Sequence, residues 1–110
     1  MSDPQLSVLI PFYNEQGNVL PLLEEIHEVL ADIPFETVCV NDCSSDSTAA
    51  ELAEAANRWP DTVRVLTHVE RAGKSAALFT GLKSVRGDWT QLLDGDGQND
   101  VNDTARLWAS

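Results

Sequence analysis

The chain has 110 residues, enough for one domain with a hydrophobic core, and its apolar fraction of 43% is ordinary for a globular protein. Its formal net charge is -11, and the first half carries no Lys or Arg because the first such residue is Arg58. This charge argues against binding to nucleic acid or to an anionic lipid surface. No segment reaches the roughly 18 apolar residues of a membrane span, and the N-terminus does not resemble a signal peptide. We therefore expect a cytoplasmic protein in which Cys39 and Cys43 form neither a disulfide nor a zinc site.

The first apolar run, residues 6–10, predicts a buried strand that is closed by Pro11. Apolar residues then recur at helical spacing over residues 19–30, which predicts an amphipathic helix with His27 on its surface. A second strand is predicted over residues 35–40, where β-branched side chains are frequent.

The second half of the chain repeats this pattern. Residues 48–51 have the spacing of a capping box, which places the start of a second helix near Ser47. A third strand is predicted over residues 63–67 and is followed by His68, which we interpret as a loop residue. A third helix is predicted with Leu78, Leu82 and Val85 on its apolar side, with small residues suited to close packing against a sheet, and with its end at Gly87. A fourth strand is predicted over residues 88–93.

Strands alternate with helices along the whole chain, and a further helix is predicted over residues 101–108. The alternation predicts an α/β fold with a mostly parallel open sheet and helices on both faces, in a single domain over residues 1–110. In such sheets the ligand lies beyond the carboxyl ends of the strands. We therefore expect three polar loops to share one edge of the sheet, namely residues 11–17, 41–48 and 94–100.

The fourth strand leads into Asp94-Gly95-Asp96, two carboxylates separated by a glycine. Carboxylate oxygens are preferred ligands of Mg²⁺ and Mn²⁺, which keep coordination positions open for phosphates. We interpret this motif as a metal–diphosphate site, with a solvated acidic loop as the alternative. A calcium-binding loop is rejected, because Asn99 and Ala105 stand where that loop needs glycine and glutamate.

Other common nucleotide and hydrolase motifs are incomplete or missing. Ala72-Gly73-Lys74-Ser75 resembles the end of a P-loop, but His68 stands where the first glycine of that motif is needed. No Gly-x-Gly-x-x-Gly follows the first strand, which argues against a dinucleotide-dependent dehydrogenase. The sequence has no nucleophile elbow and no histidine placed for a hydrolase triad.

Four segments of the chain form an ordered set of motifs, namely Pro11-Phe12-Tyr13-Asn14-Glu15 and residues 40–48, 71–81 and 87–98. In this order they resemble the front half of a family 2 glycosyltransferase of the GT-A fold. The resemblance covers almost the whole chain and is nearest to enzymes with polyprenyl-phosphate acceptors, such as dolichol-phosphate mannose synthases. Ser75 and Val101 depart from the pattern, at positions where the family often has glycine and proline.

The resemblance implies a site for a nucleotide-diphosphate sugar and a divalent cation, Mg²⁺ or Mn²⁺. Asp42 would accept a hydrogen bond from the base, Asp94 would lie near the ribose and diphosphate, and Asp96 would bind the metal. Lys74 would lie near the donor, or would simply begin a solvated helix. The nucleoside pocket would be lined by Pro11, Tyr13 and Glu15, with a strand end and ordinary packing as the alternatives for Pro11 and Tyr13.

The implied function is transfer of a sugar from this donor to an acceptor such as a polyprenyl phosphate, reached at the membrane through segments of a longer protein. The family's acceptor half and catalytic base would follow Ser110, so we expect a truncated donor-binding half without a catalytic residue of its own and with little transfer activity. A non-catalytic nucleotide-binding or regulatory module is the main alternative. A nucleotidyltransferase is disfavoured, because residues 11–17 lack a loop rich in glycine and lysine. The open sheet edge leaves a homo-oligomer as an option.

Overall fold

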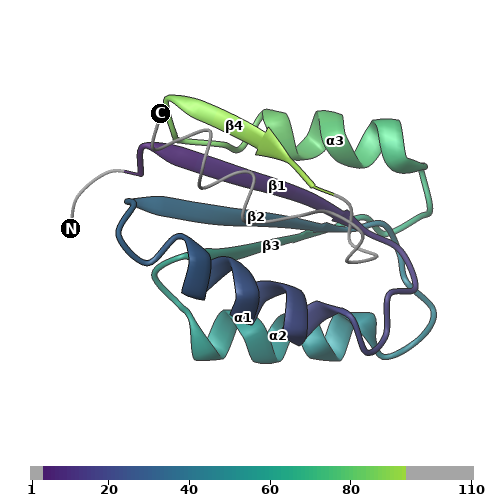
Figure 1. The fold of residues 1–110 in the computed structure, drawn as a ribbon. Coiled ribbons are helices and arrows are strands. Elements are labelled where there is room, and N and C mark those ends of the chain that lie inside the picture. The colour runs from purple at the N-terminus through teal and green to yellow at the C-terminus, as the bar shows by residue number, and fades with distance from the viewer. Residues whose placement is uncertain (1–3, 94–110) are drawn as a thin grey trace.

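The structure is a computed structural model that describes residues 4–93. Figure 1 shows a central sheet with helices on both sides. This alternation of strand and helix confirms the predicted α/β class, while the helix predicted over residues 101–108 lies outside the described residues. The strands are β1 (Leu6–Phe12), β2 (Phe35–Asn41), β3 (Val63–Thr67) and β4 (Trp89–Leu92), and the helices are α1 (Val19–Val29), α2 (Thr48–Arg58) and α3 (Lys74–Leu82).

The four strands lie in the order β3-β2-β1-β4, and every neighbouring pair is parallel. β1 pairs with β2 along its whole length, from Leu6 opposite Phe35 to Phe12 opposite Asn41. β4 pairs only with the first part of β1 and ends with Leu92 opposite Leu9. Because all strands run in the same direction, the loops that follow β1, β2 and β3 leave the sheet at one edge, where ligands of open α/β sheets bind.

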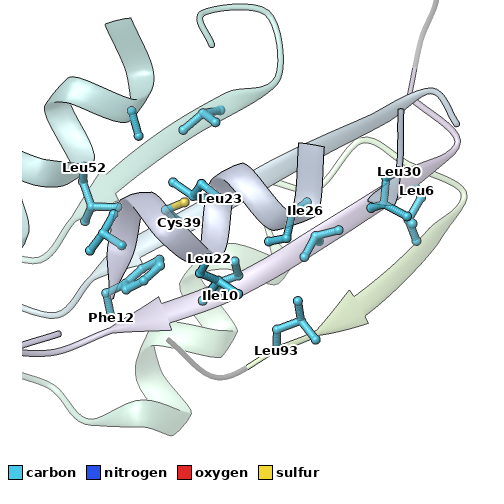
Figure 2. Close-up of a cluster of buried hydrophobic side chains, with 14 residues drawn as sticks. Leu6, Ile10, Phe12, Leu22, Leu23, Ile26, Leu30, Cys39, Leu52 and Leu93 are labelled. Carbon is cyan, nitrogen blue, oxygen red and sulfur yellow. The ribbon is translucent and has the colours of Figure 1, made fainter. Parts of the chain in front are cut away.

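The core is divided between the two faces of the sheet. Helices α1 and α2 cover one face and α3 covers the other (Figure 1). Figure 2 shows the larger cluster, in which Ile10 and Phe12 of β1 meet the apolar side of α1 and Leu52 of α2. The alternate residue Leu9 points to the other face and packs with Ala77 of α3. This alternation is the period of two that a strand buried on both faces must have.

Small residues bring α3 close to the sheet, as predicted. Ala77 and Gly81 are buried on the side of α3 that faces β1. A Cβ atom on Gly81 would overlap the buried Leu9 side chain, so a larger residue at this position would require Leu9 to shift.

The prediction that Pro11 closes the first strand is wrong, because β1 continues to Phe12. The Phe12 carbonyl accepts a hydrogen bond from Asp42 N–H on the β2 side, whereas the Leu9 carbonyl accepts one from Leu93 N–H on the β4 side. Backbone groups alternate between the two sides, so the missing N–H of Pro11 faces the β4 side, where β4 has already ended. The strand therefore loses no ladder hydrogen bond at the proline.

His27 also differs from its prediction as a surface residue, since its ring is half-buried. It stacks on Trp59 at a centroid distance of 4.4 Å and meets Phe35 edge-on at 5.0 Å. Its Nδ1 lies 2.7 Å from the Leu23 carbonyl, and its Nε2 lies 2.6 Å from the Thr62 hydroxyl. Helical periodicity puts His27 at the margin of the apolar stripe of α1. In the structure, the turn after α2 covers the His27 ring.

A buried carboxylate ties the amino end of the sheet to the segment after α3. Glu36 of β2 is 1% exposed and accepts hydrogen bonds from the Ser7 hydroxyl and the Arg86 backbone N–H, both at 2.6 Å. The Arg64 guanidinium adds a bond of 2.7 Å. Burial opposes ionisation of Glu36, but these donors outweigh it and lower the pKa of its carboxyl.

Within residues 4–93, no helix combines the length and the apolar character that crossing a bilayer requires.

Candidate functional site

The loops after β1 and β2 are joined by hydrogen bonds from the backbone of one loop to side chains of the other. Each of the four consecutive backbone N–H groups of residues 14–17 donates a hydrogen bond to a side chain from residues 44–51. In the reverse direction, the Ser45 N–H donates to the Asn14 side-chain oxygen at 2.8 Å. Two of the three predicted loops therefore lie together at the carboxyl edge of the sheet. The acceptors are Ser44 for Asn14, Thr48 for Glu15, Asp46 for Gln16 and Glu51 for Gly17, at 3.1, 2.8, 3.3 and 2.9 Å respectively.

These hydrogen bonds between the two loops engage most polar side chains of the second loop. Helix α2 starts next to Ser47, as predicted, but the Ser47 side chain makes no cap. Asp46 instead accepts from the Thr48 N–H at 2.9 Å, and Glu51 reaches the first loop rather than the start of its own helix. The capping-box spacing thus predicted the helix start correctly, although the side chains of Thr48 and Glu51 accept hydrogen bonds from the first loop. Such bonds supply the partners that loop N–H groups need.

Asp42 is the carboxylate of the second loop that lies deepest in the protein. It follows β2 directly, and its side chain is 4% exposed. Its Oδ1 accepts bonds from Ala72 N–H and His68 Nδ1, both at 2.8 Å, and its Oδ2 accepts one from Gly73 N–H at 2.8 Å. Burial alone would raise the pKa of the Asp42 carboxyl, but these three donors outweigh it and hold that pKa below its usual range. Asp42 is therefore ionised at neutral pH and fixes the loop between β3 and α3.

Gly73 is the residue that lets this loop reach Asp42. Its φ of +95° lies in the left-handed region, which side chains with a Cβ rarely adopt. It is also the N-cap residue of α3, so Lys74, the next residue, begins the helix. In the P-loop-like segment, the Gly73 N–H thus donates to the Asp42 carboxylate, and no phosphate-binding loop forms around Gly73.

The Tyr13 ring contacts a cation from the loop between β3 and α3. The Arg71 guanidinium carbon lies 3.9 Å from the centroid of the Tyr13 ring, a cation–π contact. Glu15, two residues later, accepts a hydrogen bond of 3.1 Å from the side chain of Asn18. Arg71 belongs to the motif of residues 71–81 but was not predicted as a site residue. The rule that gathers loops at the carboxyl edge would have found it, because Arg71 lies in the loop after β3.

The predicted site residues fall into two groups. Pro11, Tyr13, Glu15 and Asp42 lie together at the carboxyl ends of β1 and β2, while Lys74 lines a pocket of about 220 Å3 with Leu78, Leu92 and Leu93. Asp94 and Asp96 lie outside the described residues. Within residues 4–93, no group of three or more His, Cys, Asp or Glu side chains could hold a metal ion. The metal prediction therefore rests on Asp94 and Asp96.

Comparison with known proteins agrees with this arrangement. The model of glycosyl transferase family 2 matches residues 7–110, so the chain belongs to that family. Dolichol-phosphate mannosyltransferase of Pyrococcus furiosus is 34% identical over 95 residues, which are 86% of this chain and 26% of that protein. This confirms the family resemblance that the four motifs predicted.

Solved structures confirm the fold. Mannosyltransferase PcManGT from Pyrobaculum calidifontis, in complex with GDP-Man and Mn²⁺, superposes with a TM-score of 0.71 at 31% identity, covering 94% of this chain and 30% of that chain. S. aureus TarS in complex with UDP-GlcNAc gives a TM-score of 0.73 at 26% identity, covering 96% of this chain and 30% of that chain. The parallel sheet is therefore of the GT-A type. The chain spans less than a third of the length of each of these proteins.

Proposed function

We propose that this chain forms the donor-binding part of a metal-dependent glycosyltransferase that takes a nucleotide-diphosphate sugar. The observation that carries the proposal is the meeting of Tyr13, Asp42 and Arg71, from three separate loops, at the carboxyl edge of a parallel sheet. In a nucleotide site, an aromatic ring can stack on the base, an ionised carboxylate can accept a hydrogen bond from it, and a cation can pair with the phosphates. Membership of the family and the nucleotide-sugars bound in similar structures support the same assignment.

Each predicted residue has a role in this proposal. Tyr13 and Pro11 form a wall for the nucleoside, and Glu15 lies at the rim of the same pocket. Asp42 accepts a hydrogen bond from the base. Lys74, at the first position of α3, supplies positive charge near the diphosphate. Asp94 would follow the end of β4 near the ribose.

The metal ligand in this proposal is Asp96, and the cation is Mg²⁺ or Mn²⁺. An all-oxygen set of carboxylate and diphosphate suits either ion, and the PcManGT structure is a complex with GDP-Man and Mn²⁺. A divalent cation bound there supplies Lewis-acid stabilisation of the charge on the departing diphosphate. The protein's own part is to orient the donor, with Asp42 fixing the base end and Lys74 lying near the phosphate end.

The acceptor in this proposal is a polyprenyl phosphate, approached at the cytoplasmic surface of a membrane. The similarity to a dolichol-phosphate mannosyltransferase supports an isoprenoid phosphate as the attacking group. The phosphate oxygen of such an acceptor attacks the anomeric carbon, and the nucleoside diphosphate leaves.

Isothermal titration of the 110-residue chain with UDP and with GDP, each with and without MnCl2, tests the proposal. We expect at least one nucleotide to bind, and Asp96→Ala to weaken that binding at least tenfold, about 1.4 kcal/mol. Asp61→Asn is the matched control, because Asp61 is an exposed aspartate before β3, at the opposite edge of the sheet. Failure of both nucleotides to bind, or unchanged affinity in Asp96→Ala, would contradict the proposal. A turnover assay on the same sample then shows whether this chain transfers sugar by itself.

A further inference from the structure

Strand β4 receives little support from the burial of its own side chains. It has four residues, lies at an edge of the sheet (Figure 1), and pairs with β1 alone within the described part of the chain. Three of its residues are exposed and the fourth is partly buried. A strand without a buried face has a weakly specified register, because no hydrophobic pattern opposes a slip. The register of β4 against β1 therefore needs another determinant.

Hydrogen bonds at the amino edge of the sheet supply that determinant. The Ser7 hydroxyl of β1 donates to Glu36 Oε2 of β2 at 2.6 Å and accepts a bond of 2.8 Å from the Gly87 N–H. An ionised carboxylate only accepts hydrogen bonds, so the direction of both bonds is fixed. Glu36 Oε2 also accepts the Arg86 N–H, at 2.6 Å. Two consecutive backbone N–H groups shortly before β4 are thus bonded to side chains of β1 and β2.

Arg64 of β3 extends this network towards the end of α3. Its Nη1 donates to the Ser84 hydroxyl at 3.0 Å, and its Nη2 donates to Glu36 Oε1 at 2.7 Å. We call Ser7, Glu36 and Arg64 the amino-edge clamp. Ser7 and Glu36 are 0% and 1% exposed, so water does not compete for their bonds. Three strands therefore give the connection between α3 and β4 a fixed place on the sheet.

The place of this connection also sets where β4 ends. A parallel strand rises by about 3.3 Å per residue, so fixing one end of a short strand fixes the other. The Trp89 N–H donates to the Gln5 carbonyl at the start of the pairing, and the Leu93 N–H donates to the Leu9 carbonyl at its end. A slip of one residue would move Leu93 by the full rise and exchange the two faces of the strand.

Asp94 follows Leu93 directly in the sequence, so the position of Leu93 determines where the acidic motif starts. Magnesium binds oxygen ligands at about 2.0–2.1 Å and demands near-ideal geometry. A displacement of about 3.3 Å, the rise of one strand residue, would take a carboxylate out of reach of such an ion. The register of β4 is therefore of direct consequence for a metal site built on this motif.

We propose that the amino-edge clamp positions the metal motif Asp94-Gly95-Asp96 by setting the register of β4 from the opposite end of that strand. This inference rests on the proposed function, since it concerns the metal ligand of the same site. Ser7 and Glu36 are positioning residues here: they lie at the amino edge and act through the backbone of residues 86–93. The alternative is a clamp that contributes only to the free energy of unfolding.

Amide hydrogen exchange, followed by NMR, measures the effect on β4 without any ligand. Ser7→Ala removes the hydroxyl that joins Glu36 to Gly87. We expect the exchange rate of the Leu93 amide, relative to that of the Val38 amide in the inner strand β2, to rise at least tenfold. An unchanged ratio would overturn the inference, because the end of β4 would then not depend on the clamp.

Titration with UDP and GDP measures the effect on the metal motif. For the nucleotide that the unaltered 110-residue chain binds more tightly, we expect Ser7→Ala to weaken binding at least threefold in MnCl2 and to leave binding in EDTA unchanged. Unchanged affinity in MnCl2, or an equal loss with and without the metal, would overturn the inference and leave the proposed function standing. If neither nucleotide binds the unaltered chain, the proposed function fails and the inference fails with it.

Leu52→Ala is the matched control for general loss of stability. Leu52 is buried on α2, which covers the face of the sheet opposite α3, and it makes no contact with the clamp in the network described above. Loss of this side chain should lower the melting temperature, because it leaves a cavity. We expect the exchange ratio and the affinity in MnCl2 to stay at their original values. A rise of the ratio as large as that in Ser7→Ala would contradict the assignment of positioning to the clamp.

Glu36→Gln is a second variant within the clamp. It should raise the exchange ratio more than Ser7→Ala does, because Glu36 Oε2 accepts from both Ser7 and Arg86. A smaller effect than that of Ser7→Ala would contradict the central place of Glu36 in the clamp. If Glu36→Gln does not fold, the comparison of Ser7→Ala with Leu52→Ala decides the matter alone.

Discussion

The Arg71 guanidinium lies over the Tyr13 ring at 3.9 Å, so the loop after β3 is joined to the loop after β1 by a cation–π contact. Arg71 is largely exposed, and a contact of this kind is worth about 0.5–1 kcal/mol. A double-mutant cycle with Tyr13→Leu and Arg71→Gln should therefore give a coupling of that size. The free energies of unfolding from urea titrations measure it, and strictly additive effects would show that the contact contributes nothing.

The buried carboxylate Glu36 should be far more important for stability than an exposed one. Glu36→Gln removes the charge that pairs with Arg64 and Arg86, and loss of one partner of a buried ion pair typically costs about 3–5 kcal/mol. Arg64 is 32% exposed, so water offsets part of this cost and we expect about 2–3 kcal/mol. Urea unfolding checks this value.

A matched exposed pair provides the control for Glu36. Glu24 and Arg58 form an ion pair between α1 and α2 in which the side chains are 49% and 51% exposed. Glu24→Gln should cost less than about 1 kcal/mol, because surface ion pairs contribute little. Equal losses for Glu24→Gln and Glu36→Gln would mean that burial of Glu36 has no energetic consequence.

His27 should make the protein less stable as the pH falls below about 6.5, the ordinary histidine pKa. Burial lowers the pKa of the folded His27 ring, and the nearby Arg58 charge lowers it further, although the Leu23 carbonyl opposes this. The unfolded chain then binds more protons than the folded chain below the ordinary pKa, so the stability that is present above it is lost as the pH decreases. Melting temperatures between pH 7.5 and 5 measure the loss.

The variant His27→Gln isolates this contribution. Glutamine does not titrate, so the part of the pH slope that belongs to His27 should disappear, even though the variant is less stable throughout. An identical slope in the two proteins would assign the loss to other groups.

Gly87 should not tolerate a side chain, because its backbone lies against the start of β1. A Cβ atom there would lie 2.7 Å from the Ser7 hydroxyl oxygen and 2.8 Å from the Leu6 carbonyl carbon. Backbone atoms cannot move aside as a flexible side chain can, so Gly87→Ala should cost about 1–3 kcal/mol. The combination with Ser7→Ala distinguishes the two clashes: full recovery relative to Ser7→Ala alone would show that the hydroxyl, and not the backbone, is the obstacle.

Most of the fold could be predicted from the sequence. The spacing of apolar residues located all seven described elements, and the third strand was predicted with its observed bounds, Val63–Thr67. Errors occurred at element ends: Pro11 did not stop β1, and α3 ended at Leu82, so Val85 packs from beyond the helix. End positions depend on which neighbouring strand is still present and on how closely a helix approaches the sheet, and neither is a local property of the sequence.

The candidate site was predicted less completely. Alternation of strand and helix determined that the loops after β1 and β2 share one edge, because parallel strands leave no other arrangement. Only the tertiary structure decided the partner of each polar group. Asp46 and Glu51 became acceptors for the first loop, and His68 became the partner of Asp42. A hydrophobic pattern records which side of an element is buried, whereas a hydrogen bond depends on the position and direction of two particular atoms, which are set when distant loops pack together.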